Sequence, residues 1–313
     1  MKLNRRNVVA GIAASTAASS IPFRAAFAQS TDIVVYSSAE TDQLAPYKAA
    51  FEAENPGINV VWVRDSSGVM AAKILAERDN PRADVIFDIP LSSIAMFDSL
   101  GMVTPYTPST ASNLKPRFRD DNDPMHWTGI SVFTTVVVAN QPEMAAAGVT
   151  APISWADLLK PEYKGRIVMP NPASSATGFI TVAAWLNLFG EQGAWDYMDA
   201  LHENIQVYLH SGSQPVARTG QGEYMIGIGS ELRAAREKTQ GAPIDIIVPS
   251  EGTGWDMGAT CLTTKADKHD AAKVFVDWSC TRSAHEVAAQ FFGIVGFEGL
   301  EASPENYPTE AEG

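Results

Sequence analysis

Short apolar runs alternate with helical patterns along most of this chain, and the alternation limits the folds that it can adopt. Apolar residues recur at helical spacing in the longer segments, as Leu44, Tyr47 and Phe51 do, whereas the short runs between turn residues are typical of buried strands. Such alternation predicts parallel α/β sheets with right-handed crossovers. The first expected elements are strand 33–36, helix 43–54, strand 58–63, helix 69–78 and strand 84–87.

The length of the chain predicts two lobes rather than one. Without the export signal described below, about 285 residues remain, which is more than one simple core usually supports. Two β-rich segments, 129–138 and 252–264, are suited to cross between lobes as hinge strands. We expect an α/β fold whose lobes each have a central, mostly parallel sheet flanked by helices. The expected bounds are 29–132 plus 256–282 for lobe 1 and 133–255 plus 283–313 for lobe 2.

The first 28 residues are typical of an export signal. Asn4-Arg5-Arg6-Asn7-Val8-Val9 is a twin-arginine pattern, and Ala26-Phe27-Ala28 fits the small-residue rule for a cleavage site. The apolar stretch between them is too short and too rich in Ser and Thr to span a bilayer. An ordinary secretory signal with a chance arginine pair is the alternative. With either signal we expect a periplasmic protein. If the twin-arginine pattern is genuine, the protein is exported by the twin-arginine route.

The charge of the chain argues against two classes of partner. The formal net charge is −13, and it becomes −17 without residues 1–28, which contain four basic residues and no acidic one. So acidic a protein is a poor candidate for binding nucleic acid or anionic membranes. An anion would therefore have to be held locally, by N–H groups and hydroxyls.

Polar residues follow three successive predicted strands at the point where each strand ends. Ligands of parallel α/β sheets bind beyond the carboxyl ends of the strands, so these loops are candidates for a site. Helix capping explains each loop singly, but the recurrence of paired serines favours a binding site. The candidates are Ser37 and Ser38 after the first strand, Ser66, Ser67 and Gly68 after the second, and Asp88 after the third.

The segment 170–179, Pro-Asn-Pro-Ala-Ser-Ser-Ala-Thr-Gly-Phe, predicts an anion site at the start of a helix. It lies between a short apolar strand and the apolar run 180–189. The first N–H groups of a helix are free and carry partial positive charge, and small side chains let an oxyanion approach them. An ordinary capped helix is the alternative. The candidates are Asn171, Ser174, Ser175, Thr177 and Gly178, with Ser211 in a similar loop at 210–215.

The sequence lacks the motifs of several enzyme and metal-binding classes. It has no phosphate loop ending in Lys-Ser/Thr, no Gly-x-Ser-x-Gly, no paired-histidine zinc motif and no Cys-x-x-Cys. We therefore predict no catalytic residue, metal or cofactor. The rival is an exported hydrolase with Ser174 or Ser175 as nucleophile, which needs a general base within hydrogen-bond reach. The candidate bases are Asp65, Asp88, Glu231 and His210.

Cys261 and Cys280 are the two cysteines of the chain. An even number in an exported protein permits one disulfide. A protein that folds before export can instead keep both as buried thiols, and the sequence leaves both possibilities open.

Several motifs together resemble the periplasmic solute-binding proteins of ABC importers, in the type II class that includes ferric-ion and phosphonate binders. The resemblance covers nearly the whole mature chain. Within this class, the chain is most similar to proteins assigned to 2-aminoethylphosphonate uptake. It implies two lobes that close on a small phosphonate or phosphate ester, a monomer that docks on a membrane permease, and no chemistry. The motifs that carry it are 62–68, 154–158 with 161–165, 169–179, His210-Ser211-Gly212-Ser213 and Gly254-Trp255-Asp256-Met257.

The resemblance also implies how the ligand is held. The loops that would hold the anion match closely, so we expect Ser66–Gly68 to approach it from one lobe and Ser174–Gly178 from the other. Three loops, at 37–40, 87–90 and 230–231, depart from the aminoethylphosphonate pattern. Ferric iron is less expected, because the neighbouring tyrosine pair of ferric binders is absent. A cationic end of the ligand would pair with Asp88, Glu231 or Asp256, with Trp255 packing beside it.

Overall fold

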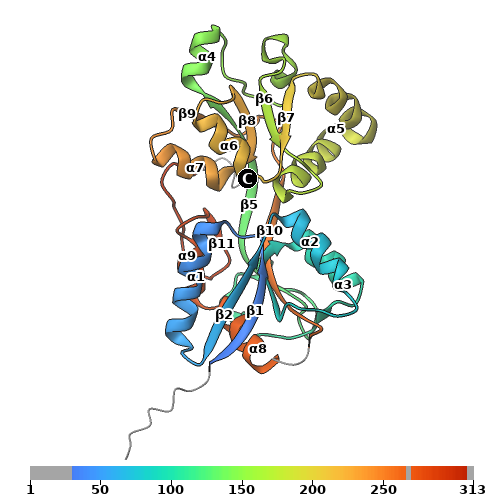
Figure 1. Cartoon of the computed structure of the whole chain (residues 1–313), viewed down its shortest axis with the longest axis vertical. Helices are drawn as coiled ribbons and strands as arrows, with labels where there is room; N and C mark the ends of the chain where they lie inside the picture. Colours follow the sequence, from blue (N-terminus) through green and yellow to red (C-terminus); the bar gives the residue numbers. More distant parts are fainter. Residues whose placement is uncertain (1–29, 266–268, 309–313) are drawn as a thin grey trace, which may run out of the picture.

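The chain folds into two α/β lobes that are stacked along its long axis (Figure 1). This computed structural model describes residues 30–265 and 269–308, so the export signal predicted at 1–28 lies outside the described residues. The two-lobed α/β fold expected from the sequence is confirmed. In Figure 1, strands β5 and β10 run through the waist between the lobes.

Lobe 1 has a mixed sheet with the strand order β2-β1-β3-β10-β5. Strands β1, β2 and β3 are parallel, whereas β10 is antiparallel to β3 and β5. The strands are β1 (Thr31–Ser37), β2 (Ile58–Arg64), β3 (Val85–Pro90), β4 (Val103–Thr104), β10 (Trp255–Thr263) and β11 (Ile294–Val295). The helices are α1 (Thr41–Glu54), α2 (Ser67–Ala76), α3 (Leu91–Ser99), α8 (His269–Ser279) and α9 (Arg282–Ala288).

Lobe 2 repeats the plan with β8 and β7 pairing in parallel on either side of β6. Its strands are β6 (Ile167–Pro170), β7 (Ile205–Leu209), β8 (Ile226–Ser230) and β9 (Ile244–Ile247). Its helices are α4 (Gln141–Ala147), α5 (Ala176–His202), α6 (Ser213–Gly220) and α7 (Glu231–Thr239). The helix predicted to start before the apolar run 180–189 is α5, which bends at Gly190 because that residue has φ +72°.

Strand β5 (Thr128–Asn140) belongs to both sheets. Its first half pairs with β10 and β11 in lobe 1, and its second half pairs with β8 and β9 in lobe 2. The change of sheet falls between Thr134, which pairs with Trp255, and Thr135, which pairs with Ser230. The β-rich segment at 129–138 therefore connects the lobes, as the sequence suggested.

Each lobe has its own aromatic core. In lobe 1, the Phe275 and Trp278 rings of α8 pack on Phe51 and Phe87, with ring centroids 4.9 to 5.4 Å apart for Phe275–Phe51, Phe275–Phe87 and Trp278–Phe51. In lobe 2, Trp185 of α5 packs edge-on against Trp155 at 5.4 Å. Burial of large aromatic residues is a major contribution to core stability, so each lobe is held by its own cluster.

The segment after α8 corrects the expected lobe boundaries. Residues 283–313 were expected in lobe 2, but α9 and β11 pack on lobe 1, where Ala284, Val287 and Val295 join the core cluster of Ile33. The apolar face of α9 and the pairing of β11 with β5 hold this segment there. The described residues after β11 stay on lobe 1 at first, where the Lys115 N–H donates to the Gly296 carbonyl, and the Tyr307 hydroxyl then reaches lobe 2 and donates to Glu231 of α7.

The two cysteines are free and buried in the structure. Cys261 lies on β10 and Cys280 follows α8, so the possible disulfide is not formed. Burial in apolar surroundings raises the pKa of the Cys280 thiol to about 11. Among the described residues, no helix combines the length and apolar character that a membrane crossing requires.

Candidate functional site

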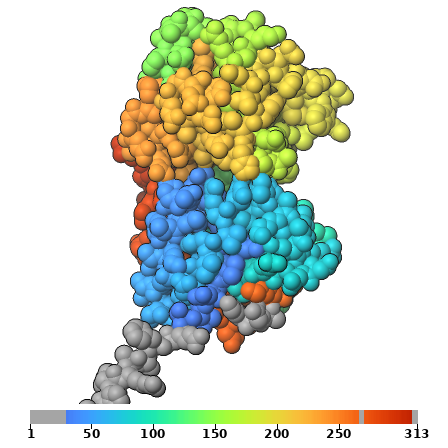
Figure 2. Space-filling view, in the orientation of Figure 1, coloured from blue at the N-terminus to red at the C-terminus, as the bar shows by residue number. Residues whose placement is uncertain are grey.

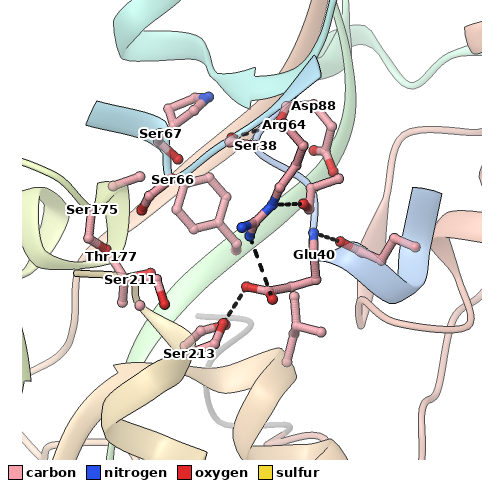
Figure 3. Close-up of a pocket in the computed structure, with 18 of the residues that line it drawn as sticks. Ser38, Glu40, Arg64, Ser66, Ser67, Asp88, Ser175, Thr177, Ser211 and Ser213 are labelled. Atoms are coloured by element: carbon pink, nitrogen blue, oxygen red, sulfur yellow. Dashed lines mark hydrogen bonds and ion pairs between the residues drawn. The ribbon is translucent and has the colours of Figure 1, made fainter. Parts of the chain in front are cut away.

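A cavity of about 70 Å³ lies between the two lobes (Figure 3). Six loops line it, and each follows the carboxyl end of a parallel strand, where α/β sheets bind ligands. Figure 2 shows the lobes in contact across the front of the molecule. Lobe 1 contributes Ser38, Glu40, Arg64, Ser66, Ser67 and Asp88, and lobe 2 contributes Ser175, Ala176, Thr177, Ser211, Ser213 and Ser230.

Two helices from opposite lobes begin at this cavity. Ser66 is the N-cap of α2 in lobe 1, and Ser175 is the N-cap of α5 in lobe 2. Among the described residues, the backbone N–H groups of Ser67, Ala176 and Thr177 have no protein acceptor. Helix N-termini with free N–H groups attract anions. The two helix starts therefore offer donors to one oxyanion from two directions.

Two buried hydroxyls add donors at the start of α5. Ser175 Oγ accepts a hydrogen bond of 3.3 Å from the Gly178 N–H, which leaves its own hydroxyl hydrogen for a ligand. Within the described chain, the Thr177 hydroxyl has no hydrogen-bond partner, although only 7% of the residue is exposed. Buried polar groups are nearly always hydrogen-bonded. The Thr177 hydroxyl is therefore suited to bind a ligand atom.

A charged pair on the other side of the cavity was not anticipated from the sequence. Arg64 Nε donates to the Ala39 carbonyl at 2.9 Å, and its Nη2 lies 3.8 Å from Glu40 Oε2. The Ser213 hydroxyl of lobe 2 donates to the same carboxylate. The expectation that N–H groups and hydroxyls alone would meet an anion did not include this guanidinium, which also lines the cavity. The position of Arg64 at the end of β2 was the available signal.

Asp88 lies in the same part of the cavity in an unusual backbone conformation. Its φ is +51°, which is uncommon for a residue other than glycine and marks strain that surrounding structure must support. Only 8% of the residue is exposed, and no described residue donates a hydrogen bond to its carboxylate. Burial raises the pKa of this carboxyl to about 7.

The raised pKa of Asp88 predicts an unusual pH dependence of stability. Its ordinary pKa is 3.8, so between about pH 4 and 7 the unfolded chain loses a proton that the folded protein keeps. Stability from this group is thus present at low pH and falls as pH rises, by at most about 1.4 kcal/mol per unit. Asp88→Asn should therefore gain stability relative to wild type from pH 5 to 8, as measured by urea unfolding. Asp121→Asn is the control, because Asp121 is exposed. If the difference in unfolding free energy between Asp88→Asn and wild type does not change with pH, the prediction is contradicted.

Three predicted residues support the cavity from behind its surface. Ser37 is fully buried, and its Oγ accepts from the Ala39 N–H at 3.1 Å. Asn171 Oδ1 accepts from the Ala173 N–H at 2.9 Å. The Ser174 hydroxyl donates to the His210 carbonyl at 2.7 Å. These side chains shape the loops, and none of them lines the cavity.

The two predicted glycines lie where helix starts pack closely. A Cβ on Gly178 would lie 2.9 Å from the Pro170 carbonyl oxygen, within the turn that leads into α5. A Cβ on Gly68 would lie 2.9 Å from Ser174 Cα, across the contact between the lobes. The Gly68 N–H also donates to the Ser174 carbonyl at 2.9 Å, so it is not free for an anion.

The remaining predicted residues lie elsewhere. Glu231 is fully buried at the start of α7, where it accepts from the Tyr307 hydroxyl. Trp255 and Asp256 line a second cavity of about 680 Å³ between α3, α5 and the start of β10. Asp256 accepts a hydrogen bond of 2.6 Å from Ser92 there. Of the three acids proposed to meet a cationic ligand end, the first cavity therefore contains Asp88 alone.

The geometry does not provide an activated serine. Among the described residues, neither Ser174 nor Ser175 hydrogen-bonds to a carboxylate or an imidazole. The His210 ring instead contacts Asp65, with Nε2 and Oδ1 3.1 Å apart. The described residues also include no group of three or more His, Cys, Asp or Glu side chains suited to hold a metal ion. A nucleophile needs an adjacent base, and the structure places none beside Ser174 or Ser175 among the described residues.

Comparisons with known proteins agree with this geometry. A family model described as bacterial extracellular solute-binding protein matches residues 80–297. A probable ABC transporter periplasmic-binding protein of Sinorhizobium fredii is 25% identical over 99% of this chain and 87% of its own. The periplasmic binding protein AfuA of Actinobacillus pleuropneumoniae, solved with exogenous fructose-6-phosphate bound, is 31% identical with a TM-score of 0.82 over 88% of each chain.

The similarity to aminoethylphosphonate proteins is more distant. A putative 2-aminoethylphosphonate-binding periplasmic protein of Salmonella typhimurium is 24% identical over 66% of this chain and 59% of its own. The expected class of protein is therefore confirmed, whereas the expected closeness to this group has less support than the likeness to AfuA.

Proposed function

This chain belongs to the bacterial extracellular solute-binding protein family, and from that premise we propose that it captures a small phosphate ester or phosphonate between its two lobes. The protein acts in the periplasm, reached by the twin-arginine route, and delivers its ligand as a monomer to the permease of an ABC importer. It binds the ligand without chemical change.

The observation that carries this proposal is the pair of helix starts that face each other across the cavity. Ser67 of α2 and Ala176 and Thr177 of α5 offer free N–H groups, and the Thr177 hydroxyl is buried without a partner. Each hydrogen bond to a charged group contributes about 1.5–3 kcal/mol. Three or four of them suffice for micromolar binding, about 8 kcal/mol, after ordering costs.

The similarity to AfuA supports a phosphorus-containing ligand. AfuA is described with a bound phosphate ester, and its chain matches this one over 88% of its length. 2-Aminoethylphosphonate is one member of the proposed class, supported by the more distant Salmonella relative.

A thermal-shift screen tests the proposal. The panel contains phosphate esters, phosphonates, inorganic phosphate, sulfonates, carboxylates, ferric iron and spermidine. A ligand at about 100 times its dissociation constant adds about 2.7 kcal/mol of stability, so a true ligand should raise the Tm by several degrees. We expect the largest shift from a phosphate ester or a phosphonate. A larger shift from iron, spermidine or a carboxylate would overturn the proposal.

A further inference from the structure

The cavity has two chemically different sides. Figure 3 shows Ser66, Ser175 and Thr177 on one side and Glu40 and Asp88 on the other, with Arg64 between them. On the first side, the Ser175 and Thr177 hydroxyls and the free N–H groups of the two helix starts can donate to a bound anion, whereas the Ser66 hydroxyl donates to the His210 carbonyl. The other side must therefore contact the part of the ligand that is remote from its phosphorus atom.

Asp88 is the acceptor on that second side. The residue is more than nine-tenths buried, and within the described chain no group donates to its carboxylate. Its position is fixed by close packing: a Cβ on Gly258 of β10 would lie under 3.0 Å from Asp88 Oδ1. A buried carboxylate without a donor is costly, and the strained φ of +51° adds to that cost. A ligand that donates a hydrogen bond to the Asp88 carboxylate would offset this cost.

Arg64 places donors beside that acceptor. Its Nε is used by the Ala39 carbonyl, whereas its other N–H groups have no hydrogen-bond acceptor among the described residues. The Glu40 carboxylate is occupied by the Arg64 ion pair and the Ser213 hydroxyl. This side of the cavity therefore offers one open acceptor, Asp88, together with open guanidinium donors.

Hydroxyl groups match this mixture and an ammonium group does not. A hydroxyl donates one hydrogen bond and accepts others, so it can donate to Asp88 while it accepts from Arg64. An ammonium group has three donors and no acceptor, and it would also lie beside the guanidinium charge. The open groups therefore favour a neutral, hydroxylated ligand end.

We propose that the ligand is a phosphorylated polyol and that Asp88 is the specificity-determining residue that accepts a hydrogen bond from one of its hydroxyls. This inference rests on the proposed function, because it assumes that the phosphorus end binds at the starts of α2 and α5. It adds the chemical class of the other end, and it excludes aminoalkyl phosphonates as the preferred ligands.

A matched pair of ligands tests the proposal by calorimetry. 2-Hydroxyethylphosphonate and 2-aminoethylphosphonate differ only in the terminal hydroxyl or ammonium group. Wild-type protein should bind the hydroxyl compound at least about tenfold more tightly, and fructose 6-phosphate more tightly than inorganic phosphate by a similar factor. Inorganic phosphate reports on the anion side alone.

Two variants assign the preference to Asp88. Asp88→Gly removes the side chain while it tolerates the positive φ, and Asp88→Asn keeps the shape but removes the charge. Asp88→Gly should abolish the preference for the hydroxyl compound and leave the affinity for inorganic phosphate within about threefold; Asp88→Asn should reduce the preference. Asp256→Asn is the matched control, because that acid lies in the second cavity, and it should change neither affinity.

The possible outcomes separate this inference from the proposed function. Tighter binding of 2-aminoethylphosphonate by wild type, or an equal loss of every ligand in both Asp88 variants, would overturn the inference alone. If neither inorganic phosphate nor any phosphorus compound binds, the proposed function fails and the inference fails with it.

Discussion

Gly68→Ala is expected to weaken binding of every ligand at least about 100-fold, because it prevents the two lobes from closing. Gly68 lies in the first turn of α2, and a Cβ there would lie 2.9 Å from Ser174 Cα and closer still to the Ala173 carbonyl oxygen of lobe 2. Both obstacles are backbone atoms that cannot rotate away. Loss of the contacts from one lobe removes two or more hydrogen bonds to the anion, at about 1.5–3 kcal/mol each.

Solution scattering measures the closure itself. We expect wild type to show a smaller radius of gyration with saturating ligand, because clamp proteins close by a hinge. Gly68→Ala should keep the larger value. Gly57→Ala is the control, since a Cβ at that lobe 1 position would have no atom within 4 Å. A Gly68→Ala protein that contracts and binds like wild type would show that this contact does not limit closure.

The double variant Ser175→Ala with Thr177→Val is expected to weaken binding of every anionic ligand at least tenfold. It removes two buried hydroxyls from the cavity and leaves the shape of α5 nearly unchanged. Each lost hydrogen bond to a charged group is worth about 1.5–3 kcal/mol, and 1.4 kcal/mol is a factor of ten. Calorimetry with inorganic phosphate and with the best ligand of the screen measures the loss.

Two controls isolate the hydroxyls from other effects. Ser174→Ala changes the neighbouring serine, whose hydroxyl donates to the His210 carbonyl outside the cavity, and it should alter affinity less than about threefold. Thr281→Ala removes the N-cap of α9, which lies far from the ligand. This variant measures how much stability is lost with an N-cap such as Ser175, and we expect a loss of about 1 kcal/mol. An affinity of the double variant within a factor of two of wild type would refute the assignment of the anion site.

The sequence predicted the two helix starts that line the cavity because local rules determine them. A strand followed by small hydroxyl residues and an apolar run predicts a helix start with free N–H groups, and α2 and α5 both begin in this way. Which of two adjacent serines lines the cavity was not predictable. Ser174 and Ser175 are the same residue type, and the cap geometry alone directs Ser175 inward and Ser174 toward His210.

The other side of the cavity could not be predicted, because contacts between distant residues form it. Glu40 and Ser213 are 173 positions apart and meet only when the two lobes approach. Asp256 was expected beside the ligand, yet the register of β10 places it next to Ser92 in the second cavity. The assignment of α9 to lobe 2 was wrong for a similar reason. The apolar face of α9 shows that the helix packs on a core, but it does not show which of the two cores.

A crystal structure of the protein with the tightest phosphate ester of the screen tests the central claim most directly. The account predicts that the phosphorus atom lies between the starts of α2 and α5, with its oxygens hydrogen-bonded to Thr177 of one lobe and to Ser67 of the other. A phosphate group that contacts one lobe only, or that lies beside Trp255 in the second cavity, would contradict it.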